Sequence, residues 1–189
     1  MNLIIGLVGY SNSGKETLYR TVYEFFHIPR ITSGDMVRRE VKKRGLDLTP
    51  KNISLVSDLI RKENNNNFMI IAEEEISKLS KCHDVLIIDS LREEKDYSTL
   101  RQFSSNIKTI ALVSESRIRY ERMIGRKREG DPITWEEFLV LEQKGKLLGV
   151  ENLIKSADYI VRNEDSLNKF RKQSIITMKE LLDKHYLSI

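Results

Sequence analysis

The stretch that decides the fold is Gly9-Tyr10-Ser11-Asn12-Ser13-Gly14-Lys15-Glu16-Thr17. It follows the apolar run of residues 3–8, which predicts a buried strand, and it precedes a segment with helical spacing of apolar residues. A strand, then G-x-x-x-x-G-K, then a helix is the phosphate-binding P-loop arrangement. The two glycines let the backbone approach a polyphosphate, and the loop amides form a nest for anions. We therefore expect residues 9–17 to hold nucleotide phosphates, with Lys15 at the β- and γ-phosphates.

Two positions depart from the general motif. The residue after the lysine is usually Ser or Thr, whose hydroxyl reaches Mg²⁺, but here it is Glu16 and the hydroxyl is shifted to Thr17. A carboxylate at this place opposes a nucleotide unless it turns outward or meets the metal. Asn12 replaces a usual loop glycine, and Asn tolerates positive φ better than most residues.

Composition sets the class of protein. With 40% hydrophobic and 32% charged residues, the chain is expected to form one soluble globular domain over residues 1–189. A net charge of +4 suits an anionic ligand and is too small to indicate nucleic acid. Cys82 is the only cysteine, so no disulfide framework is possible and a cytoplasmic location is expected. No apolar stretch approaches the roughly 18–20 residues of a spanning helix, so no membrane contact is expected.

A second apolar run ends in an acid. Residues 83–89 read His-Asp-Val-Leu-Ile-Ile-Asp, and such a continuous run is typical of a parallel strand that is covered on both faces. Asp89 at its carboxyl end lies where open α/β sheets bind ligands. It either caps a helix or, beside a P-loop, serves Mg²⁺ in the Walker-B manner. Arg92 follows within one turn and can reach the same cleft.

The segment after the first helix offers a second anion site. Residues 27–31 predict a short strand, and Pro29 indicates an edge or a strand-end position. Thr32-Ser33-Gly34-Asp35 is then an [ST]-x-x-[DE] start signal for a basic helix. Either this helix is simply capped with a solvated basic face, or its hydroxyls and Arg38 bind a second phosphate.

A further helix carries arginines on one face. Arg119, Arg122 and Arg126 are spaced i, i+3, i+7, and like charges at such spacings destabilise a helix. A screened surface face is one interpretation. The other is an arginine lid over residues 119–136 that closes on the transferring phosphates, with a hinge at Gly130 to Pro132.

The other segments complete an alternating pattern. Residues 50–80 predict helices interrupted by the Asn run at 64–67, residues 107–113 and 157–163 predict strands, and a last helix begins at Ser166. Trp135 is expected to be a packing residue. The loop after residue 162 lies beyond a strand's carboxyl end and is expected to line the cleft.

Taken together these stretches resemble the P-loop nucleotide kinases, with features of adenylate kinase and dephospho-coenzyme A kinase. The most similar group is that of archaeal adenylate-kinase-related proteins of undefined substrate. Residues 31–38 look like the I-S-T-G-D-M-L-R acceptor segment, residues 88–92 like L-D-G-F-P-R one residue shorter, and residues 122–126 like the R-I-V-G-R start of the lid. Residues 157–163 are similar to the A-D-x-x-I-x-N strand of dephospho-coenzyme A kinases.

The resemblance implies a three-layer αβα fold with a mostly parallel five-stranded sheet, an acceptor-binding segment at about 32–80 and a small lid. It implies transfer of the γ-phosphoryl group of ATP, with Mg²⁺, to a nucleotide-like acceptor. The implied roles group as follows: phosphate contacts from Gly9 to Thr17; catalysis by Lys15, Asp89, Arg122 and Arg126; metal contacts from Thr17 and Asp89; acceptor contacts from Ser33, Gly34, Asp35, Arg38 and Arg92.

One departure from the family favours a rival interpretation. The helix after Trp135 carries no second lid arginine, and Lys144 or Lys146 could replace it only as point charges. Together with Glu16, this favours a nucleotide-binding sensor without acceptor chemistry. A polynucleotide 5′-hydroxyl kinase would need a basic channel with stacking aromatics, and aromatics make up only 7% of the chain. The acceptor, the preference for ATP or GTP, and the oligomeric state stay open.

Overall fold

Five parallel strands form the centre of the molecule. The computed structural model describes residues 1–65 and 67–187, and in it the strand order is β2-β3-β1-β4-β5. The strands are β1 (Leu3–Val8), β2 (Arg30–Thr32), β3 (Val85–Leu91), β4 (Ile107–Val113) and β5 (Tyr159–Arg162). Every pairing is parallel, so all carboxyl ends meet at one edge of the sheet. The predicted parallel α/β sheet is confirmed, with β2 at an edge as Pro29 indicates.

Alternation along β1 creates two cores. Leu3, Ile5 and Leu7 point into one cluster, while Ile4 and Val8 point into the other, because successive strand residues face opposite sides. All six residues of β1 are buried, as expected for a central strand covered on both faces. The middle layer of the fold therefore follows directly from the first apolar run.

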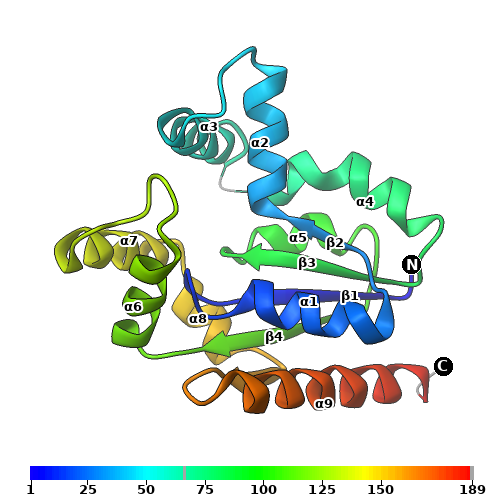
Figure 1. Ribbon diagram of the computed structural model, residues 1–189. Coiled ribbons are helices and arrows are strands. Elements are labelled where there is room, and N and C mark those ends of the chain that lie inside the picture. Colours follow the sequence, from blue (N-terminus) through cyan, green and yellow to red (C-terminus); the bar gives the residue numbers. More distant parts are fainter. Residues whose placement is uncertain (66, 188–189) are drawn as a thin grey trace.

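Helices cover both faces of the sheet (Figure 1). The helices α1 (Lys15–Phe26) and α9 (Leu167–Tyr186) pack on one face and contact each other. The other face is covered by the 3-10 helix η1 (Phe68–Ala72) and by α4 (Glu73–Ser80), α5 (Asp96–Leu100) and α8 (Val150–Lys155). This is the predicted three-layer arrangement.

Four further helices stand beyond the carboxyl ends of the strands. They are α2 (Ser33–Lys43) and α3 (Pro50–Glu63) on the side of β2, and α6 (Ser116–Arg126) and α7 (Trp135–Leu147) beyond β4 (Figure 1). These two pairs bound the place where ligands bind in open α/β sheets.

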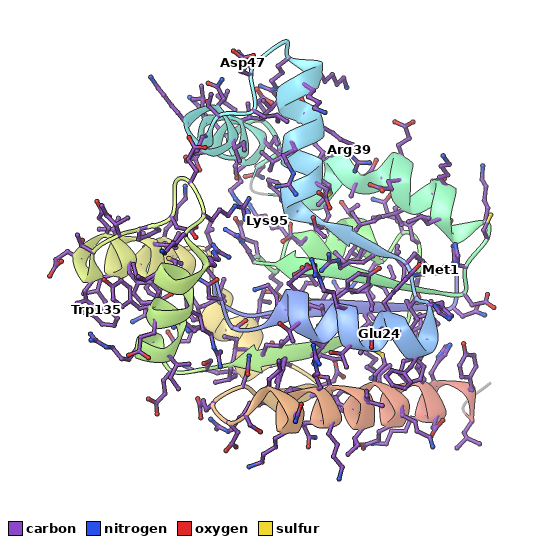
Figure 2. All side chains as sticks on the ribbon, in the orientation of Figure 1. Met1, Glu24, Arg39, Asp47, Lys95 and Trp135 are labelled. Atoms are coloured by element: carbon purple, nitrogen blue, oxygen red, sulfur yellow. The ribbon has the colours of Figure 1, made fainter. Side chains whose placement is uncertain are left out.

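Local signals explain where these helices begin. Thr32 accepts a hydrogen bond from the backbone N–H of Asp35, which confirms the predicted start signal of α2. Thr134 and Glu137 form a reciprocal capping box at α7. Trp135, at the start of α7 (Figure 2), stacks on Phe138 and meets Tyr120 edge-on, so it is a packing residue as predicted.

Some boundaries differ from the expected ones. The second strand begins at Arg30 rather than at residue 27, and β3 extends two residues beyond Asp89. Helix α3 ends at Glu63 and η1 begins at Phe68, which agrees with a break at the Asn run, although Asn66 lies outside the described residues. Among residues 1–65 and 67–187, no helix combines the length and apolar character needed to cross a membrane.

Candidate active site

The loop between β1 and α1 has the backbone of an anion nest. Gly9 and Gly14 have φ angles of 147° and 111°, and Asn12 adopts φ 60°, in the left-handed region that Asn tolerates. A Cβ atom on Gly9 would lie 2.6 Å from the carbonyl oxygen of Leu112, and one on Gly14 would collide with the Asn163 amide. Both glycines are therefore required by conformation and by close contact.

Lys15 lies across this loop. Its Nζ donates hydrogen bonds to the carbonyl oxygens of Gly9 at 2.7 Å and Tyr10 at 3.0 Å. The pKa of Lys15 is lowered from 10.5 to about 8, mainly by burial; the carboxylate of Asp89 opposes this shift, and the positive charge of Arg92 contributes to it. The ammonium group is thus held beside the loop and lines the pocket, where an anionic ligand could bind it.

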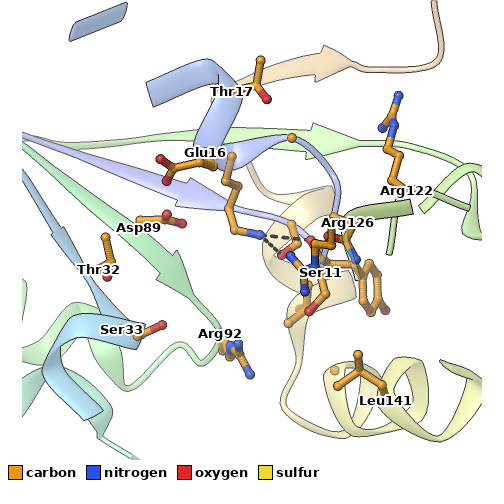
Figure 3. Close-up of a pocket in the computed structure, with 18 of the residues that line it drawn as sticks. Ser11, Glu16, Thr17, Thr32, Ser33, Asp89, Arg92, Arg122, Arg126 and Leu141 are labelled. Atoms are coloured by element: carbon orange, nitrogen blue, oxygen red, sulfur yellow. Dashed lines mark hydrogen bonds between the residues drawn. The ribbon is translucent and has the colours of Figure 1, made fainter. Parts of the chain in front are cut away.

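The loop faces a pocket of about 860 Å³. Segments far apart in the sequence supply its walls, as Figure 3 shows: the P-loop, the start of α2, the end of β3, helices α6 and α7, and the loop before α9. The predicted site residues that line it are Gly9, Tyr10, Ser11, Asn12, Gly14, Lys15, Glu16, Thr17, Ser33, Gly34, Asp35, Arg38, Asp89, Arg92, Arg122 and Arg126. Ser13 is not among the lining residues, because it is 1% exposed beneath the loop.

Glu16 turns toward β2 and α1 rather than toward the lysine. Its carboxylate accepts hydrogen bonds from Arg20 at 2.7 Å and pairs with Arg30 at 2.8 Å. Burial raises the pKa of the Glu16 carboxyl, but the hydrogen bonds from Arg20 and Arg30 outweigh it and hold that pKa below its ordinary value. The departure from the general motif is therefore accommodated by two arginines.

Arg30 is a site residue that sequence reasoning missed. The same Nη1 atom that meets Glu16 lies 3.4 Å from the carboxylate of Asp89, and the guanidinium stacks over the ring of Tyr19 at 3.8 Å. Strand β2 lies beside β3, which brings Arg30 to the Walker-B acid. The only available signal was an arginine in a short strand, and strand adjacency is not written in the local sequence.

Thr17 and Asp89 are not brought together. Figure 3 shows the Thr17 side chain on the opposite side of the start of α1 from Glu16 and Asp89. Successive residues of a helix point about 100° apart, so a hydroxyl one position later faces a different direction. The predicted joint metal contact of Thr17 and Asp89 does not match this arrangement.

The residues predicted to bind the acceptor include one arginine that is paired and one that has no partner among the described residues. Asp35 accepts a hydrogen bond from the Thr32 hydroxyl at 2.7 Å and from Arg38 at 2.5 Å, so Arg38 is neutralised locally. In contrast, no hydrogen bond or ion pair joins the guanidinium of Arg92 to another of the described residues. Burial lowers the pKa of Arg92, and Arg61 lowers it further. An anionic ligand would relieve this unpaired charge.

Asp96 fixes the loop that carries Arg92. Its buried carboxylate accepts backbone N–H groups from Arg92 and Glu93, both at 3.2 Å, and from Phe68 at 3.0 Å. Arg61 pairs with Glu93 at 2.7 Å in the same buried region. This support of the loop that carries Arg92 was not predicted, because only the folded chain brings the backbone of residues 68 and 92 to the same carboxylate.

Arg119 and Arg122, two of the three arginines predicted to share one face of α6, make contacts of different kinds. Arg119 is 3% exposed and paired with Glu142 of α7, so it belongs to the packing between α6 and α7 and not to a phosphate-facing row. Arg122 donates to Ser114 at 3.1 Å and to the backbone oxygen of Asn163 at 2.8 Å. The expectation that the three share one role was wrong for Arg119, because Glu142 supplies a buried counter-charge.

The loop beyond α6 lies against the start of α3. Arg126 pairs with Asp131 at 2.5 Å, and a Cβ atom on Gly130 would lie 2.7 Å from Pro50 at the start of α3. Lys144 of α7 pairs with Asp58 of α3 at 2.7 Å. The suggested replacement of a lid arginine by Lys144 is therefore not what this structure shows.

The segment after β5 joins the P-loop. Asn163 donates from its side chain to the carbonyl oxygen of Ser13 at 2.9 Å, and with Asp165 it lines the pocket as predicted. The side chains of Tyr10, Asn12 and Ser13 each bury a polar atom without a partner among the described residues. The ring of Tyr10 lies against Gly145 and under the guanidinium of Arg119, at 4.8 Å.

The donor set suits Mg²⁺ that arrives with a nucleotide. Oxygen ligands from Asp89 and Glu16 lie beside the P-loop, and Mg²⁺ is usually held by one or two carboxylates plus phosphates. No group of three metal-binding side chains occurs in the described part of the chain. The residues fit a metal held jointly with phosphates rather than an all-protein cage.

Comparison with solved structures shows the fold. The chain is similar to TT1252 from Thermus thermophilus with a TM-score of 0.65 and 17% identity, covering 95% of this chain and 98% of that one. A shikimate kinase from Bacteroides thetaiotaomicron aligns with a TM-score of 0.60 and 17% identity over 96% of this chain and 98% of that chain. A gluconokinase from Sinorhizobium meliloti aligns with a TM-score of 0.59 and 15% identity over 97% of this chain and 95% of that chain. The architecture is therefore that of P-loop kinases.

Sequence comparison shows the family. Residues 8–139 match the family model described as "AAA domain". A UPF0200 protein of Pyrococcus abyssi is 33% identical over 183 residues, which are 95% of this chain and 97% of that protein. A UPF0200 protein of Hyperthermus butylicus is 33% identical over 91% of each chain. The chain therefore belongs to the AAA domain family that this model describes and to the UPF0200 proteins.

Proposed function

We propose that this protein is a phosphotransferase that moves the γ-phosphoryl group of Mg-ATP to a nucleotide-like acceptor. The acceptor would be a nucleoside monophosphate or a molecule like dephospho-coenzyme A. One observation carries the proposal: a single pocket is lined by Lys15 of the loop and by Arg92, whose positive charge acts on Lys15 and whose guanidinium forms no hydrogen bond or ion pair with another described residue. Two phosphate-bearing ligands in one pocket is the arrangement that phosphoryl transfer requires, because such reactions depend on positioning and charge stabilisation.

On the donor side, the backbone of residues 9–17 cradles the phosphates and Lys15 exchanges its two carbonyl contacts for phosphate oxygens. Asp89 faces the metal. Mg²⁺, when bound, neutralises charge on the phosphates. Thr17, which points away from Asp89, contributes its hydroxyl to the phosphates instead.

On the acceptor side, Arg92 binds the anionic group of the acceptor. Ser33 and Gly34 at the start of α2 line the same pocket. Arg38 also binds the acceptor once its hydrogen bond to Asp35 is broken. Asp35 then orients the acceptor. A guanidinium suits this task because its planar fork matches phosphate oxygens.

On the lid side, Arg122 and Arg126 stabilise the charge that develops during transfer. Both line the pocket, but Arg126 is engaged with Asp131. Its use in catalysis therefore requires the loop after α6 to rearrange, as lids of such enzymes do on substrate binding.

An acceptor panel tests the reaction. The protein is incubated with Mg-ATP and, separately, with nucleoside monophosphates, dephospho-coenzyme A or buffer, and ADP formation is followed. We expect ADP release only with an acceptor of this class, and Arg92→Met should lose that release while Arg101→Met, on an exposed control arginine, keeps it. ADP release that is equal in all samples and in Arg92→Met would contradict the acceptor assignment.

The donor site has its own test. Lys15→Ala should weaken ATP binding at least about tenfold, the scale of a charge-assisted hydrogen bond that is lost. Lys172→Ala on the exposed face of α9 is the matched control. Equal ATP titrations for Lys15→Ala and the unaltered protein would refute the P-loop assignment.

A nucleotide-binding sensor is the second candidate. It is favoured by the carboxylate directly after Lys15 and by the pairing of Lys144 with Asp58, which leaves α7 without a cation for the transition state. Binding of Mg-ATP without ADP formation from any acceptor would support the sensor over the kinase.

A further inference from the structure

Two carboxylates from separate elements face one another beside the P-loop. Glu16 of α1 and Asp89 of β3 both meet the Nη1 atom of Arg30, at 2.8 Å and 3.4 Å. Figure 3 shows Glu16 and Asp89 on the same side of the start of α1. Each carboxylate is thereby placed to share one cation with the other.

The guanidinium of Arg30 is largely buried and is held in a fixed orientation. Its side chain is only 12% exposed, and its guanidinium stacks 3.8 Å over Tyr19, which fixes its direction. Asp89 is 7% exposed, and a carboxylate as buried as this needs a counter-charge. The guanidinium supplies one positive charge where two negative charges meet.

The position of Glu16 makes this arrangement relevant to the nucleotide. It directly follows Lys15, where the general motif places the hydroxyl that reaches the metal. Phosphates on the loop amides would therefore lie close to the Glu16 carboxylate, and like charges repel unless a cation stands between them. Thr17 faces the other side of the helix and does not supply that cation's ligand.

We propose that Glu16 and Asp89 together are the protein's ligands for the divalent metal of a bound nucleotide, and that Arg30 is the counter-ion that holds this pair when no metal is present. Carboxylate oxygens suit Mg²⁺ and Mn²⁺, and two of them plus phosphates match the usual protein share of such a site. The inference rests on the nucleotide-binding part of the proposed function and not on transfer to an acceptor.

The test is a binding measurement. The affinity for AMP-PNP, a non-hydrolysable ATP analogue, is measured once in the presence of Mn²⁺ and once in EDTA. The metal coupling is the affinity with Mn²⁺ divided by the affinity in EDTA. Mn²⁺ environment is read in parallel by electron paramagnetic resonance. The variants are Glu16→Gln, Arg30→Gln and Thr17→Val, with Glu24→Gln as the matched control on the exposed part of α1 (Figure 2). Thermal melts establish that each variant is folded.

Glu16→Gln and Arg30→Gln are expected to change the affinity in EDTA and the metal coupling in opposite directions. Glu16→Gln should bind AMP-PNP more tightly in EDTA, because a repelling charge is gone, and should lose at least about tenfold of the metal coupling, the scale on which metal surroundings tune affinity. Arg30→Gln should bind more weakly in EDTA and show larger coupling, since it removes the one guanidinium that contacts both carboxylates. Thr17→Val should lose affinity to a similar degree in both conditions, because it removes a hydroxyl that contacts the phosphates, and should therefore keep the coupling of the unaltered protein. Glu24→Gln should keep both the affinity and the coupling.

Unchanged coupling and an unchanged Mn²⁺ spectrum in Glu16→Gln would overturn this inference while leaving nucleotide binding intact. Coupling lost in Thr17→Val instead would overturn it in favour of the hydroxyl. Failure of the unaltered protein to bind AMP-PNP in both conditions would overturn the inference together with the proposed function.

Discussion

At the scale of single residues, Lys15 makes nucleotide binding sensitive to pH. Burial lowers its pKa to about 8, whereas a bound phosphate favours the charged ammonium and raises that pKa in the complex. Binding near pH 8 therefore takes up a proton, and affinity should fall as pH rises through about 8. Calorimetry of ADP binding in two buffers of different ionisation enthalpy measures the uptake. The same proton uptake in Lys15→Ala would show that another group titrates.

Asp96 is a second residue with a specific expected effect. Its carboxylate accepts three backbone N–H groups, and an amide in its place would turn an NH₂ group toward at least one donor. Asp96→Asn should cost about 1–3 kcal/mol of the free energy of unfolding, as expected for a buried group left unsatisfied.

Urea denaturation measures this cost, with Asp183→Asn on an exposed part of α9 as the control. A midpoint for Asp96→Asn equal to that of the control would show that the three hydrogen bonds add nothing.

Which site residues were predictable also depends on single residues. Lys15, Asp89 and Arg92 were predicted because each stands at a fixed distance from a recognisable strand or motif, and the pocket contains all three. Arg30 and Asp96 were missed because their roles depend on neighbours 59 and 28 residues away. No local pattern carries such a pairing.

At the scale of elements, one buried ion pair fixes α6 on α7. Arg119 and Glu142 are 3% and 7% exposed, and Arg119 also donates to the backbone oxygen of Ser114 at 2.8 Å. Glu142→Gln leaves the guanidinium buried without a counter-charge, so we expect a loss of about 3–5 kcal/mol of the free energy of unfolding. Glu136→Gln, on the exposed side of α7, is the control in urea denaturation. Similar losses in both variants would contradict the special place of Glu142.

A glycine in α7 serves the contact with the P-loop. A Cβ atom on Gly145 would lie 2.8 Å from Cε1 of Tyr10, whereas one on Gly125 in α6 would meet nothing within 4 Å. Replacing a helical glycine by alanine ordinarily gains about 1 kcal/mol. We expect Gly125→Ala to show this gain in the free energy of unfolding, whereas Gly145→Ala should not, because its methyl group would collide with Tyr10.

Because Tyr10 is part of the loop that we propose to bind phosphates, Gly145→Ala should also weaken ADP binding, while Gly125→Ala should not. Thermal denaturation and ADP titration of the two variants check both effects. A gain in stability with unaltered ADP affinity in Gly145→Ala would show that Tyr10 moves aside freely.

At the scale of the whole molecule, the layers were predictable and the neighbours were not. The apolar runs at β1 and β3, separated by helical patterns, indicate a parallel sheet covered on both faces. The order β2-β3-β1-β4-β5 was not predicted, because no run of residues records which strands become neighbours. Likewise, the fate of Arg119 depended on where α7 packs, and the spacing of arginines within α6 holds no information about that.

The contact between Gly130 and Pro50 has a consequence for the sequence of events in solution. Because Gly130 in the loop after α6 lies close to Pro50 in the first turn of α3, we expect a ligand that displaces one of these pocket walls to displace the other as well. Free-energy coupling between two sites is reciprocal, so the donor must alter acceptor affinity by the same factor as the acceptor alters donor affinity. We therefore expect the binding of donor and acceptor to be cooperative, with either sign, and not independent.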